Sequence, residues 1–431
     1  MKLVIVGTGY VGLVSGACFA EFGYQTICVD KDKDRIESLN SGKCPFFEPG
    51  MDDLLYKHLR ISKLLSFSSS LSDSMKDADI IFITVGTPNR RLEDDADLTS
   101  VWSVAEEISE NIKNYCLVVT KSTVPIGTSD EIKKIIENKI SKDNFDVVSN
   151  PEFLREGSAI KDFMYPDRVV IGTENQRSEN IMKKLYNPLM IKKTPLISTS
   201  IKSSEIIKYA SNSFLATKIG FINEVADLCE AVGADVKDIA KAMGIDNRIG
   251  SKFLQAGPGY GGSCFPKDVK AFVSTAKKFN VNLSILSSVN QSNENRINNI
   301  ANKIIKKIDK NSQITLLGLS FKPNTDDIRE STSLKLATIL SENGYTINCF
   351  DPVSINNTKK EFHKLKYFKN SFDACDGSHA LIIGTEWDEF KKLNFKKIAK
   401  ILKQKNIFDL RNILDSNELE KLGYSYYGTG K

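Results

Sequence analysis

A glycine-rich stretch that ends in a cysteine has the clearest chemical potential in this sequence. It runs Gly257-Pro-Gly-Tyr-Gly-Gly-Ser-Cys264-Phe-Pro-Lys267-Asp268. Glycine lets the backbone approach a ligand closely and adopt positive φ angles, and a thiolate is favoured beside cationic groups or a helix N-terminus. Most cysteines are inert packing residues. The setting of Cys264 instead predicts a nucleophilic thiol, with the carboxylate of Asp268 four residues further on.

A long amphipathic pattern over residues 203–232 predicts a single helix that ends at Gly233. Its length suits a connector or a dimer interface. Lys208 and Asn212 are four residues apart and would share one face of this helix. An ammonium and an amide that point the same way could stabilise one developing oxyanion. We therefore expect both to work with Cys264, although a single lysine is more often a solvated surface residue.

The elements that must position this chemistry begin with a dinucleotide fingerprint. An apolar run, residues 1–6, leads into Gly7-Thr-Gly9-Tyr-Val-Gly12, and a helical pattern follows over residues 13–22. The next predicted strand ends in Asp30, close to where the fingerprint places its acid. Gly9 and the helix N-terminus would accept a pyrophosphate, and Asp30 would accept hydrogen bonds from the adenosine ribose. Because Asp30 would repel a 2′-phosphate, we expect NAD rather than NADP; the alternative is a turn that binds FAD or nothing.

Two further apolar strand patterns end in loops that contain threonine. Residues 79–85 lead into Thr87, and residues 117–120 lead into Thr123. The carboxyl ends of parallel strands line the binding crevice of an open sheet, so both hydroxyls could face the cofactor. As ordinary turn residues they would have no role.

Another strand pattern, residues 145–149, leads into a segment with Glu152 and Glu156. Four residues separate the two carboxylates, and on a helix they would share one face. Like charges on one face are mildly unfavourable unless water, a substrate or the helix dipole uses them. A solvated capping pair is the alternative.

The last third of the chain repeats the pattern of the first. Residues 313–317 form a predicted strand, residues 331–342 a helix, and residues 346–350 a strand that ends in Asp351. The full glycine fingerprint is missing, which indicates a second Rossmann-like domain that holds a different nucleotide. Residues 380–383 and 406–409 have the pattern of its later strands.

The fold class expected is α/β, with two Rossmann-like, doubly wound domains joined by a long central helix and a helical dimerisation region. We expect a NAD-binding domain at residues 1–199 and a central helical region with the cysteine loop at residues 200–300. The second nucleotide-binding domain would occupy residues 301–431.

Composition excludes several classes of function. The 431 residues carry 59 basic and 54 acidic side chains, a net charge of +5 without long blocks of one sign, so nucleic acid is not implied. The eight cysteines form no C-x-x-C pair and no metal-ligand spacing with the three histidines, so we expect neither disulfides nor a metal site. No signal peptide and no apolar run long enough to span a membrane are visible, so we expect a cytoplasmic protein.

The three histidines, His58, His363 and His379, lie outside these motifs, so lysine, aspartate and water must serve in acid–base steps. Oxidation of an alcohol to a carbonyl needs no thiol. A thiol explains a second oxidation, because a thiolate adds to an aldehyde and the thiohemiacetal gives up another hydride to become a thioester that water cleaves. Cys264 therefore indicates a dehydrogenase that forms a covalent intermediate.

These motifs resemble those of the UDP-glucose/GDP-mannose dehydrogenases. The resemblance spans essentially the whole chain, in order, through Gly7-x-Gly9-x-x-Gly12, Lys121-Ser-Thr-Val-Pro, Asn150-Pro-Glu-Phe-Leu-Arg-Glu, Gly259-Tyr-Gly-Gly-Ser-Cys-Phe-Pro-Lys-Asp and Phe321-Lys-Pro-Asn-Thr-Asp-Asp-Ile-Arg-Glu-Ser. It implies oxidation of a sugar C6 alcohol to a carboxylate with two NAD, and a UDP-sugar site in residues 301–431.

The sequence of the cysteine loop, Tyr260-Gly-Gly-Ser263-Cys264, favours UDP-glucose as the substrate. The UDP-N-acetylmannosamine relatives tend to carry a histidine at the position of Ser263. GDP-mannose or another nucleotide sugar remains the alternative.

The resemblance also implies roles for individual residues. Cys264 would be the nucleophile, Lys208 and Asn212 would stabilise the oxyanion, and Asp268 with Thr123 would order the lysine and a catalytic water. The residues expected to face NAD are Gly7, Gly9, Tyr10, Val11, Gly12, Asp30, Arg35, Thr87, Thr123, Glu156 and Arg329. Those expected to face the nucleotide sugar are Glu152, Phe153, Leu154, Arg155, Lys208, Asn212, Arg248, Phe253, Gly261 and Lys322. Glu152 would also assist water or proton transfer. Arg248 resembles the arginine that this family lends across its dimer interface, so we expect a homodimer.

Two other functions are compatible with parts of this pattern. A two-electron dehydrogenase of the 6-phosphogluconate type shares the Rossmann domain and helical dimerisation, but it needs neither Cys264 nor a second nucleotide domain. A non-catalytic sensor would bind NAD or a nucleotide sugar without turnover, and the joint presence of Cys264, Lys208, Asn212 and Asp268 argues against it.

Overall fold

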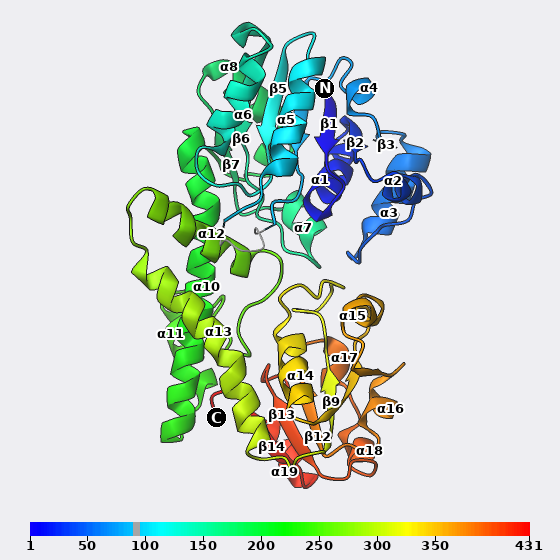
Figure 1. Ribbon diagram of the computed structural model, residues 1–431, viewed down its shortest axis with the longest axis vertical. Helices are drawn as coiled ribbons and strands as arrows, with labels where there is room; N and C mark the ends of the chain where they lie inside the picture. The colour runs from blue at the N-terminus through cyan, green and yellow to red at the C-terminus, as the bar shows by residue number, and fades with distance from the viewer. Residues whose placement is uncertain (89–94) are drawn as a thin grey trace. The chain divides into compact units, whose positions relative to one another are not determined.

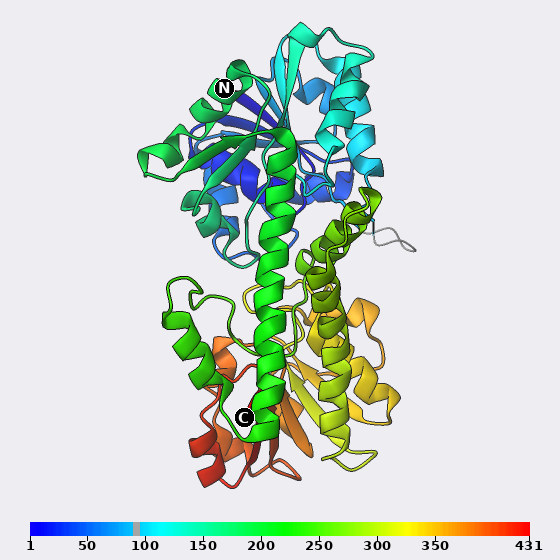
Figure 2. The ribbon, with the colours of Figure 1, turned by 90° about the vertical axis from the view of Figure 1, so that its left-hand side faces the viewer.

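The computed structural model describes residues 1–88 and 95–431, which divide into two compact units. The first unit comprises Met1–Ser211 and Ser274–Asn280, and the second comprises Asn212–Val273 and Val281–Lys431. Helix α10 (Ile201–Val232) begins in the first unit and continues without a break into the second (Figure 2). The long helix predicted over residues 203–232 is therefore confirmed.

An eight-stranded sheet forms the centre of the first unit (Figure 1). Its order is β3-β2-β1-β4-β5-β6-β7-β8, and every neighbouring pair is parallel except the single bridge between β6 and β7. The first six strands thus have the 3-2-1-4-5-6 order of a doubly wound dinucleotide-binding fold. The strands are β1 (Lys2–Val6), β2 (Gln25–Val29), β3 (Leu65–Ser68), β4 (Ile80–Ile83), β5 (Cys116–Thr120), β6 (Phe145–Ser149), β7 (Val169–Gly172) and β8 (Leu196–Thr199).

Both faces of this sheet are covered by helices. Leu3 and Ile5 of β1 belong to one hydrophobic cluster, and Val4 and Val6 belong to another, because successive side chains of a strand point to opposite faces. The first cluster includes residues of α1 (Tyr10–Glu21), α2 (Lys33–Asn40), α3 (Met51–Tyr56), α7 (Ala159–Met164), α8 (Gln176–Leu185) and α9 (Asn187–Ile191). The second includes residues of α4 (Leu71–Ser74), α5 (Thr99–Asn111) and α6 (Thr128–Glu137). Two short helical turns, η1 (Lys57–Ile61) and η2 (Lys142–Asn144), complete the unit.

A six-stranded, fully parallel sheet forms the centre of the second unit, in the order β11-β10-β9-β12-β13-β14. Counted along the chain, this is again 3-2-1-4-5-6, so the prediction of two Rossmann-like domains is confirmed. The strands are β9 (Gln313–Leu317), β10 (Thr346–Phe350), β11 (Lys366–Tyr367), β12 (Ala380–Ile383), β13 (Asn406–Asp409) and β14 (Ser425–Gly428).

Helices surround this second sheet as well (Figure 1). They are α13 (Ser284–Ile305), α14 (Thr332–Glu342), α15 (Ile355–Glu361), α16 (Ser371–Cys375), α17 (Asp388–Lys391), α18 (Phe395–Ile398) and α19 (Ser416–Lys421). The remaining helices are α11 (Val236–Ile245) and α12 (Phe265–Lys278), whose last residues lie in the first unit. None of the helices in the described part of the chain combines the length and the apolar character that a membrane span needs.

The two Rossmann-like sheets carry an acid at the same position, directly after their second strand, but the two acids differ in environment. The Oδ2 atom of Asp30 accepts hydrogen bonds from the backbone N–H and the hydroxyl of Thr8, both at 2.8 Å. Asp351 is 1 % exposed and accepts from six donors, namely the N–H groups of Leu319, Ser320, Val353 and Ser354, the Ser320 hydroxyl and the indole N–H of Trp387. Asp351 is thus buried, and its carboxylate is fully hydrogen-bonded within the protein, which indicates a structural role. Asp30 remains partly exposed.

We expect Asp351→Ala to lower the free energy of unfolding of the second unit by at least about 3 kcal/mol, because several buried N–H groups would lose their only acceptor. The measurement is urea unfolding followed by the fluorescence of Trp387 in a Trp102→Phe background, since the chain has two tryptophans. Asp388→Ala, which removes an exposed carboxylate from α17, is the control. A loss of under 1 kcal/mol for Asp351→Ala would contradict this role.

Candidate active site

The glycine turn after β1 has the geometry of a dinucleotide site. Gly7 has a φ angle of 104°, which favours glycine, and a Cβ at Gly12 would lie 1.9 Å from the Gly7 carbonyl oxygen. A Cβ at Gly9 would meet no heavy atom within 4 Å, so this position is open to a ligand. Helix α1 begins at Tyr10, three residues before the predicted start, and its first-turn N–H groups point toward that opening.

Asp30 is placed to receive the ribose of a dinucleotide. Burial raises its pKa, but the bonds from Thr8 and Asp32 and the Arg35 guanidinium at 3.4 Å outweigh burial and hold the pKa below its usual range. A charged carboxylate accepts hydrogen bonds from hydroxyls and repels a phosphate. The residues present therefore fit NAD.

The loops after β4 and β5 lie side by side at the carboxyl end of the sheet. The Thr87 hydroxyl donates to the Thr123 carbonyl oxygen at 2.8 Å. Glu205, a buried residue of α10, accepts from the N–H groups of Gly127 at 2.7 Å and Ser129 at 3.0 Å, and so holds the start of α6. Burial raises the pKa of Glu205 despite these bonds. The two predicted threonines thus lie next to each other, on loops that the Thr87–Thr123 bond and Glu205 hold in place.

The segment that carries Glu152 and Glu156 is an irregular loop, and the idea that the two carboxylates share a helix face is wrong. The chain becomes helical only at Ala159. The Glu152 carboxylate accepts from the Leu154 N–H at 2.5 Å, which fixes a local turn there in place of a helical turn. Arg155 is held to Asp162 by an ion pair of 2.6 Å.

Lys208 of α10 and Glu152 form a buried ion pair in the first unit. The ammonium lies 2.9 Å from the Glu152 carboxylate and 2.6 Å from its carbonyl oxygen. The Phe153 ring lies 5.3 Å from the same ammonium and 3.6 Å from the guanidinium of Arg168. Two predicted substrate residues, Glu152 and Phe153, therefore surround the predicted oxyanion lysine.

A second buried lysine, Lys121, accompanies this pair. It donates to the side-chain oxygen of Asn150 at 3.2 Å and to the Tyr186 hydroxyl at 3.4 Å. Burial lowers its pKa to about 8; the charge of Lys208 also lowers it, and the charge of Glu152 raises it. Lys121 is a titratable group of the site to which sequence reasoning gave no role.

In the second unit, Cys264 directly precedes α12. Its carbonyl oxygen accepts from the Asp268 N–H at 2.8 Å, the first bond of the helix, so the predicted spacing of four residues is helical. Cys264 is half-buried, and the positive end of the helix dipole favours a thiolate there. Burial raises the pKa of five other cysteine thiols, which are those of Cys18, Cys28, Cys116, Cys349 and Cys375. The Cys264 thiol lies 3.6 Å from the Ser263 hydroxyl.

Hydrogen bonds to side chains fix the glycine loop ahead of Cys264. Gly257 donates to Asn223 at 2.8 Å and accepts from the buried guanidinium of Arg296 at 2.5 Å. Asn293 accepts from the Tyr260 N–H at 2.8 Å and donates to its carbonyl oxygen at 3.1 Å. Sequence reasoning missed Asn223, Arg296 and Asn293, because nothing in their local sequence marks them.

Two glycines of this loop lie against a neighbouring segment. A Cβ at Gly261 would lie 2.3 Å from the backbone oxygen of Glu330, and one at Gly262 would lie 2.6 Å from the ring of Phe321. Gly262 also has a φ angle of 82° and donates its N–H to the Arg329 carbonyl oxygen at 3.0 Å. Only glycine fits these positions, so the spacing read from the sequence has a steric cause.

Asn212 and Asp268 are paired beside this loop. The Asn212 amide donates to the Asp268 carboxylate at 2.6 Å, and Lys267 forms an ion pair with the same carboxylate at 2.7 Å. Asn212 and Asp268 are buried. Lys208 and Asn212 stand one turn apart on α10, as predicted, and each holds a carboxylate.

The remaining predicted residues of the second unit lie in its loops. Arg329 pairs with Asp327 at 2.7 Å, and the Lys322 ammonium lies 5.2 Å from the centre of the Phe321 ring. Phe253, with a φ angle of 66°, packs on Phe265 at 6.1 Å. Arg248 is exposed and pairs with Asp246 at 2.6 Å.

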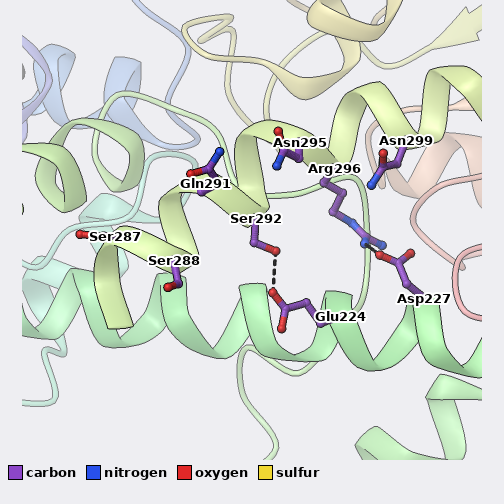
Figure 3. Close-up of a pocket in the computed structure, with 9 residues that line it drawn as sticks. All are labelled: Glu224, Asp227, Ser287, Ser288, Gln291, Ser292, Asn295, Arg296 and Asn299. Carbon is purple, nitrogen blue, oxygen red and sulfur yellow. Dashed lines mark hydrogen bonds and ion pairs between the residues drawn. The ribbon is translucent and has the colours of Figure 1, made fainter. Parts of the chain in front are cut away.

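A polar groove of about 490 Å³ lies between α10 and α13 (Figure 3). Arg296 points to Asp227 across it, and the Ser292 hydroxyl donates to Glu224 at 2.7 Å. None of the predicted site residues lines this groove. The groove is linked to the cysteine loop through Arg296, which also donates a hydrogen bond to the Gly257 carbonyl oxygen.

These features define a dehydrogenase-type dinucleotide domain in the first unit and a second Rossmann-like domain in the other. The chain belongs to the UDP-glucose/GDP-mannose dehydrogenase family. Residues 1–190 match the family's NAD-binding domain, residues 202–295 its central domain and residues 315–416 its UDP-binding domain. The expectation of a NAD-dependent dehydrogenase is confirmed, and a dehydrogenase without a second nucleotide domain is excluded.

Relatives with the name UDP-glucose 6-dehydrogenase match the chain over its full length. A UDP-glucose 6-dehydrogenase from Rhizobium meliloti (strain 1021) is 45% identical, with 100% of both chains covered. A UDP-glucose 6-dehydrogenase from Bacillus subtilis (strain 168) is 41% identical, with 100% of this chain and 93% of the relative covered. Among solved structures, a UDP-glucose dehydrogenase from Pyrobaculum islandicum matches with a TM-score of 0.91 and 33% identity, covering 100% of this chain and 97% of the other.

We expect Gly261→Ala to lower kcat at least about 100-fold, because the added Cβ must displace the Glu330 backbone and with it the loop that presents the thiol. The measurements are kcat and the rate of Cys264 alkylation by iodoacetamide. Gly220→Ala, in the middle of α10, is the control, because its Cβ would meet Val289 at an ordinary 3.4 Å. Turnover of Gly261→Ala within threefold of the wild type would show that the close approach is dispensable.

Proposed function

We propose that the protein oxidises UDP-glucose to UDP-glucuronate with two NAD and one water. The observation that carries this proposal is Cys264, a half-buried thiol at the start of α12, on a glycine loop fixed by close backbone contacts. The UDP-glucose 6-dehydrogenases that are 45% and 41% identical over the full chain support the choice of sugar.

The proposed reaction has two oxidations, and the second of them uses the Cys264 thiol. The C6 alcohol first loses a proton to a base and a hydride to give an aldehyde. The Cys264 thiolate adds to that carbonyl carbon, and the thiohemiacetal loses a second proton and hydride to become a thioester. Water then cleaves the C–S bond, which releases the carboxylate and restores the thiol. NAD held at the turn of Gly7, Gly9 and Gly12 would supply the hydride acceptor, one molecule for each oxidation.

We assign the supporting roles to the charged pairs of the two units. Lys208 and Asn212 stabilise the oxyanion that forms when the thiolate or water adds. Glu152 assists water or proton transfer, and Asp268 with Thr123 orders the lysine and that water. What supports these roles is burial: Lys208, Glu152, Asn212 and Asp268 are each buried and paired, so they are already desolvated.

We assign the cofactor and substrate contacts as the resemblance implies. Gly7, Gly9, Tyr10, Val11, Gly12, Asp30, Arg35, Thr87, Thr123, Glu156 and Arg329 face NAD, and the open space over Gly9 supports this. The nucleotide sugar contacts Phe153, Leu154, Arg155, Phe253, Gly261 and Lys322, with Arg248 of a second copy. The division into residues 1–199, 200–300 and 301–431 and a cytoplasmic location stay predictions.

The test of this function is a count of NADH released from limiting UDP-glucose in excess NAD, with GDP-mannose in parallel. We expect the wild type to release two NADH per UDP-glucose. Cys264→Ser should release no NADH in the second, acid-forming oxidation, because the serine variant cannot form the thioester. Cys229→Ser, at a buried cysteine of α10 away from the glycine loop, is the matched control. One NADH per sugar, or unchanged acid production by Cys264→Ser, would contradict the mechanism. Two NADH from GDP-mannose alone would keep the mechanism and change the substrate.

We also propose that the protein is a homodimer through α10. Phe214, Phe221 and Leu228 are 66%, 50% and 62% exposed and stand seven residues apart, so they form one apolar stripe along the helix. A second copy is the natural partner, because a two-fold axis sets identical stripes against each other. It would also give the exposed Arg248 a substrate to contact, in the site of the other copy.

Phe221→Asp should convert the dimer to a monomer, because a charge in the centre of the stripe would lose its hydration on association. Light scattering after gel filtration measures the mass, and turnover should fall together with the dimer fraction. Phe372→Asp, at an exposed phenylalanine of α16, should leave the mass unchanged. A wild type that is monomeric at micromolar concentration would rule the dimer out.

A further inference from the structure

Glu48 is a buried carboxylate of the first unit to which neither the fingerprint nor the resemblance gives a role. It lies between α2 and α3, in the segment Pro45-Phe-Phe-Glu48-Pro-Gly50, and is 6% exposed. A buried carboxylate is costly unless it is fully hydrogen-bonded. Its partners therefore show what the residue does.

The carboxylate of Glu48 joins two segments that are distant in sequence. Its Oε2 atom accepts from the Gly157 N–H at 2.6 Å and from the Tyr10 hydroxyl. Its Oε1 atom accepts from the Ala159 N–H at 2.7 Å and the Ile160 N–H at 3.5 Å. Four donors thus converge on one side chain.

Three of these donors lie at the end of the loop that carries Glu152 and Glu156. Helix α7 begins at Ala159, and the side chain before it, Ser158, does not cap the helix. Glu48 supplies the missing acceptor to the Ala159 N–H from 111 residues away in the chain. The loop is therefore fastened at its far end by Glu48, and at its near end by the pair of Glu152 with Lys208.

The fourth donor, Tyr10, is the first residue of α1 and stands inside the dinucleotide fingerprint. Its hydroxyl also accepts from the Gly157 N–H at 2.8 Å, and its ring packs on Phe46 at 4.8 Å. Burial first, and then the Glu48 carboxylate, raise the pKa of Tyr10, so the hydroxyl stays protonated and keeps donating. Glu48, Tyr10 and Gly157 thus form one closed triangle of contacts.

We propose that Glu48 is a positioning residue that couples the dinucleotide turn to the loop of residues 150–158. Through this triangle, the start of α1 and the backbone next to Glu156 are held in one arrangement, which sets both for NAD. The assignment of Glu156 to NAD rests on the proposed function, but the contacts of Glu48 do not.

A carboxylate is required here because every group that faces it is a donor. Glutamine has one acceptor oxygen, so its NH₂ group would face the N–H of either Gly157 or Ala159, and neither N–H can accept a hydrogen bond. Glu48→Gln therefore keeps the size of the side chain while it breaks the triangle. Tyr10→Phe removes only the hydroxyl and leaves the three amide bonds to Glu48 intact.

We expect Glu48→Gln to raise the KM and the directly titrated Kd for NAD about tenfold, and Tyr10→Phe to raise them about threefold. The control is Glu21→Gln, which removes another carboxylate of the same unit, paired with Lys57 at 2.8 Å and His58 at 2.7 Å. A purely structural role would lower the melting temperature and the active fraction of both glutamine variants and leave the Kd for NAD unchanged.

The coupling itself is tested with the Glu48→Gln/Glu156→Gln double variant. If Glu48 acts through the loop, its substitution changes the Kd for NAD less than about threefold once Glu156 is gone, because the two effects are not additive. Fully additive effects, or a Kd of Glu48→Gln within twofold of the wild type, would overturn the proposal. Failure of the proposed function is seen separately, in the NADH count of the wild type.

Discussion

Buried carboxylates that accept backbone N–H groups hold the loops on which the site depends. An irregular loop at a strand end leaves N–H groups without partners, and burying them unpaired costs more than a hydrogen bond returns. Glu205 accepts such N–H groups next to the loop that carries Thr123, and Glu48 accepts them at the end of the loop that carries Glu152. Each carboxylate comes from a different element, so the loops are set by tertiary contacts and not by their own sequence.

The same sheet order serves two different purposes in the two units. Both sheets run 3-2-1-4-5-6, and both place an acid after the second strand. Asp30 retains exposure and a charge-stabilising partner in Arg35, which suits a ligand hydroxyl. Asp351 has all its acceptors occupied by the protein. The fold therefore repeats, while the environment of the acid after the second strand differs between the two units.

Sequence patterns predicted the strands, the long helix and the glycine loops well, because each depends on local periodicity or on glycine at fixed positions. Gly12, Gly261 and Gly262 are examples, since steric contact within one turn or loop explains them. The helix face for Glu152 and Glu156 was wrong because a tertiary ion pair with Lys208 fixes that segment. Glu48 and Arg296 could not be found at all, because their partners lie 109 and 39 residues away.

The pairing of Lys208 with Glu152 also bears on how an oxyanion would be stabilised. An ammonium has three N–H donors, and two of those of Lys208 are directed at the carbonyl and carboxylate oxygens of Glu152. The lysine has therefore already lost water and most of its conformational freedom before a substrate arrives. Asn212 is held in the same way by Asp268. Donors fixed in advance need little reorganisation when negative charge develops, which is the condition under which such groups lower a barrier most.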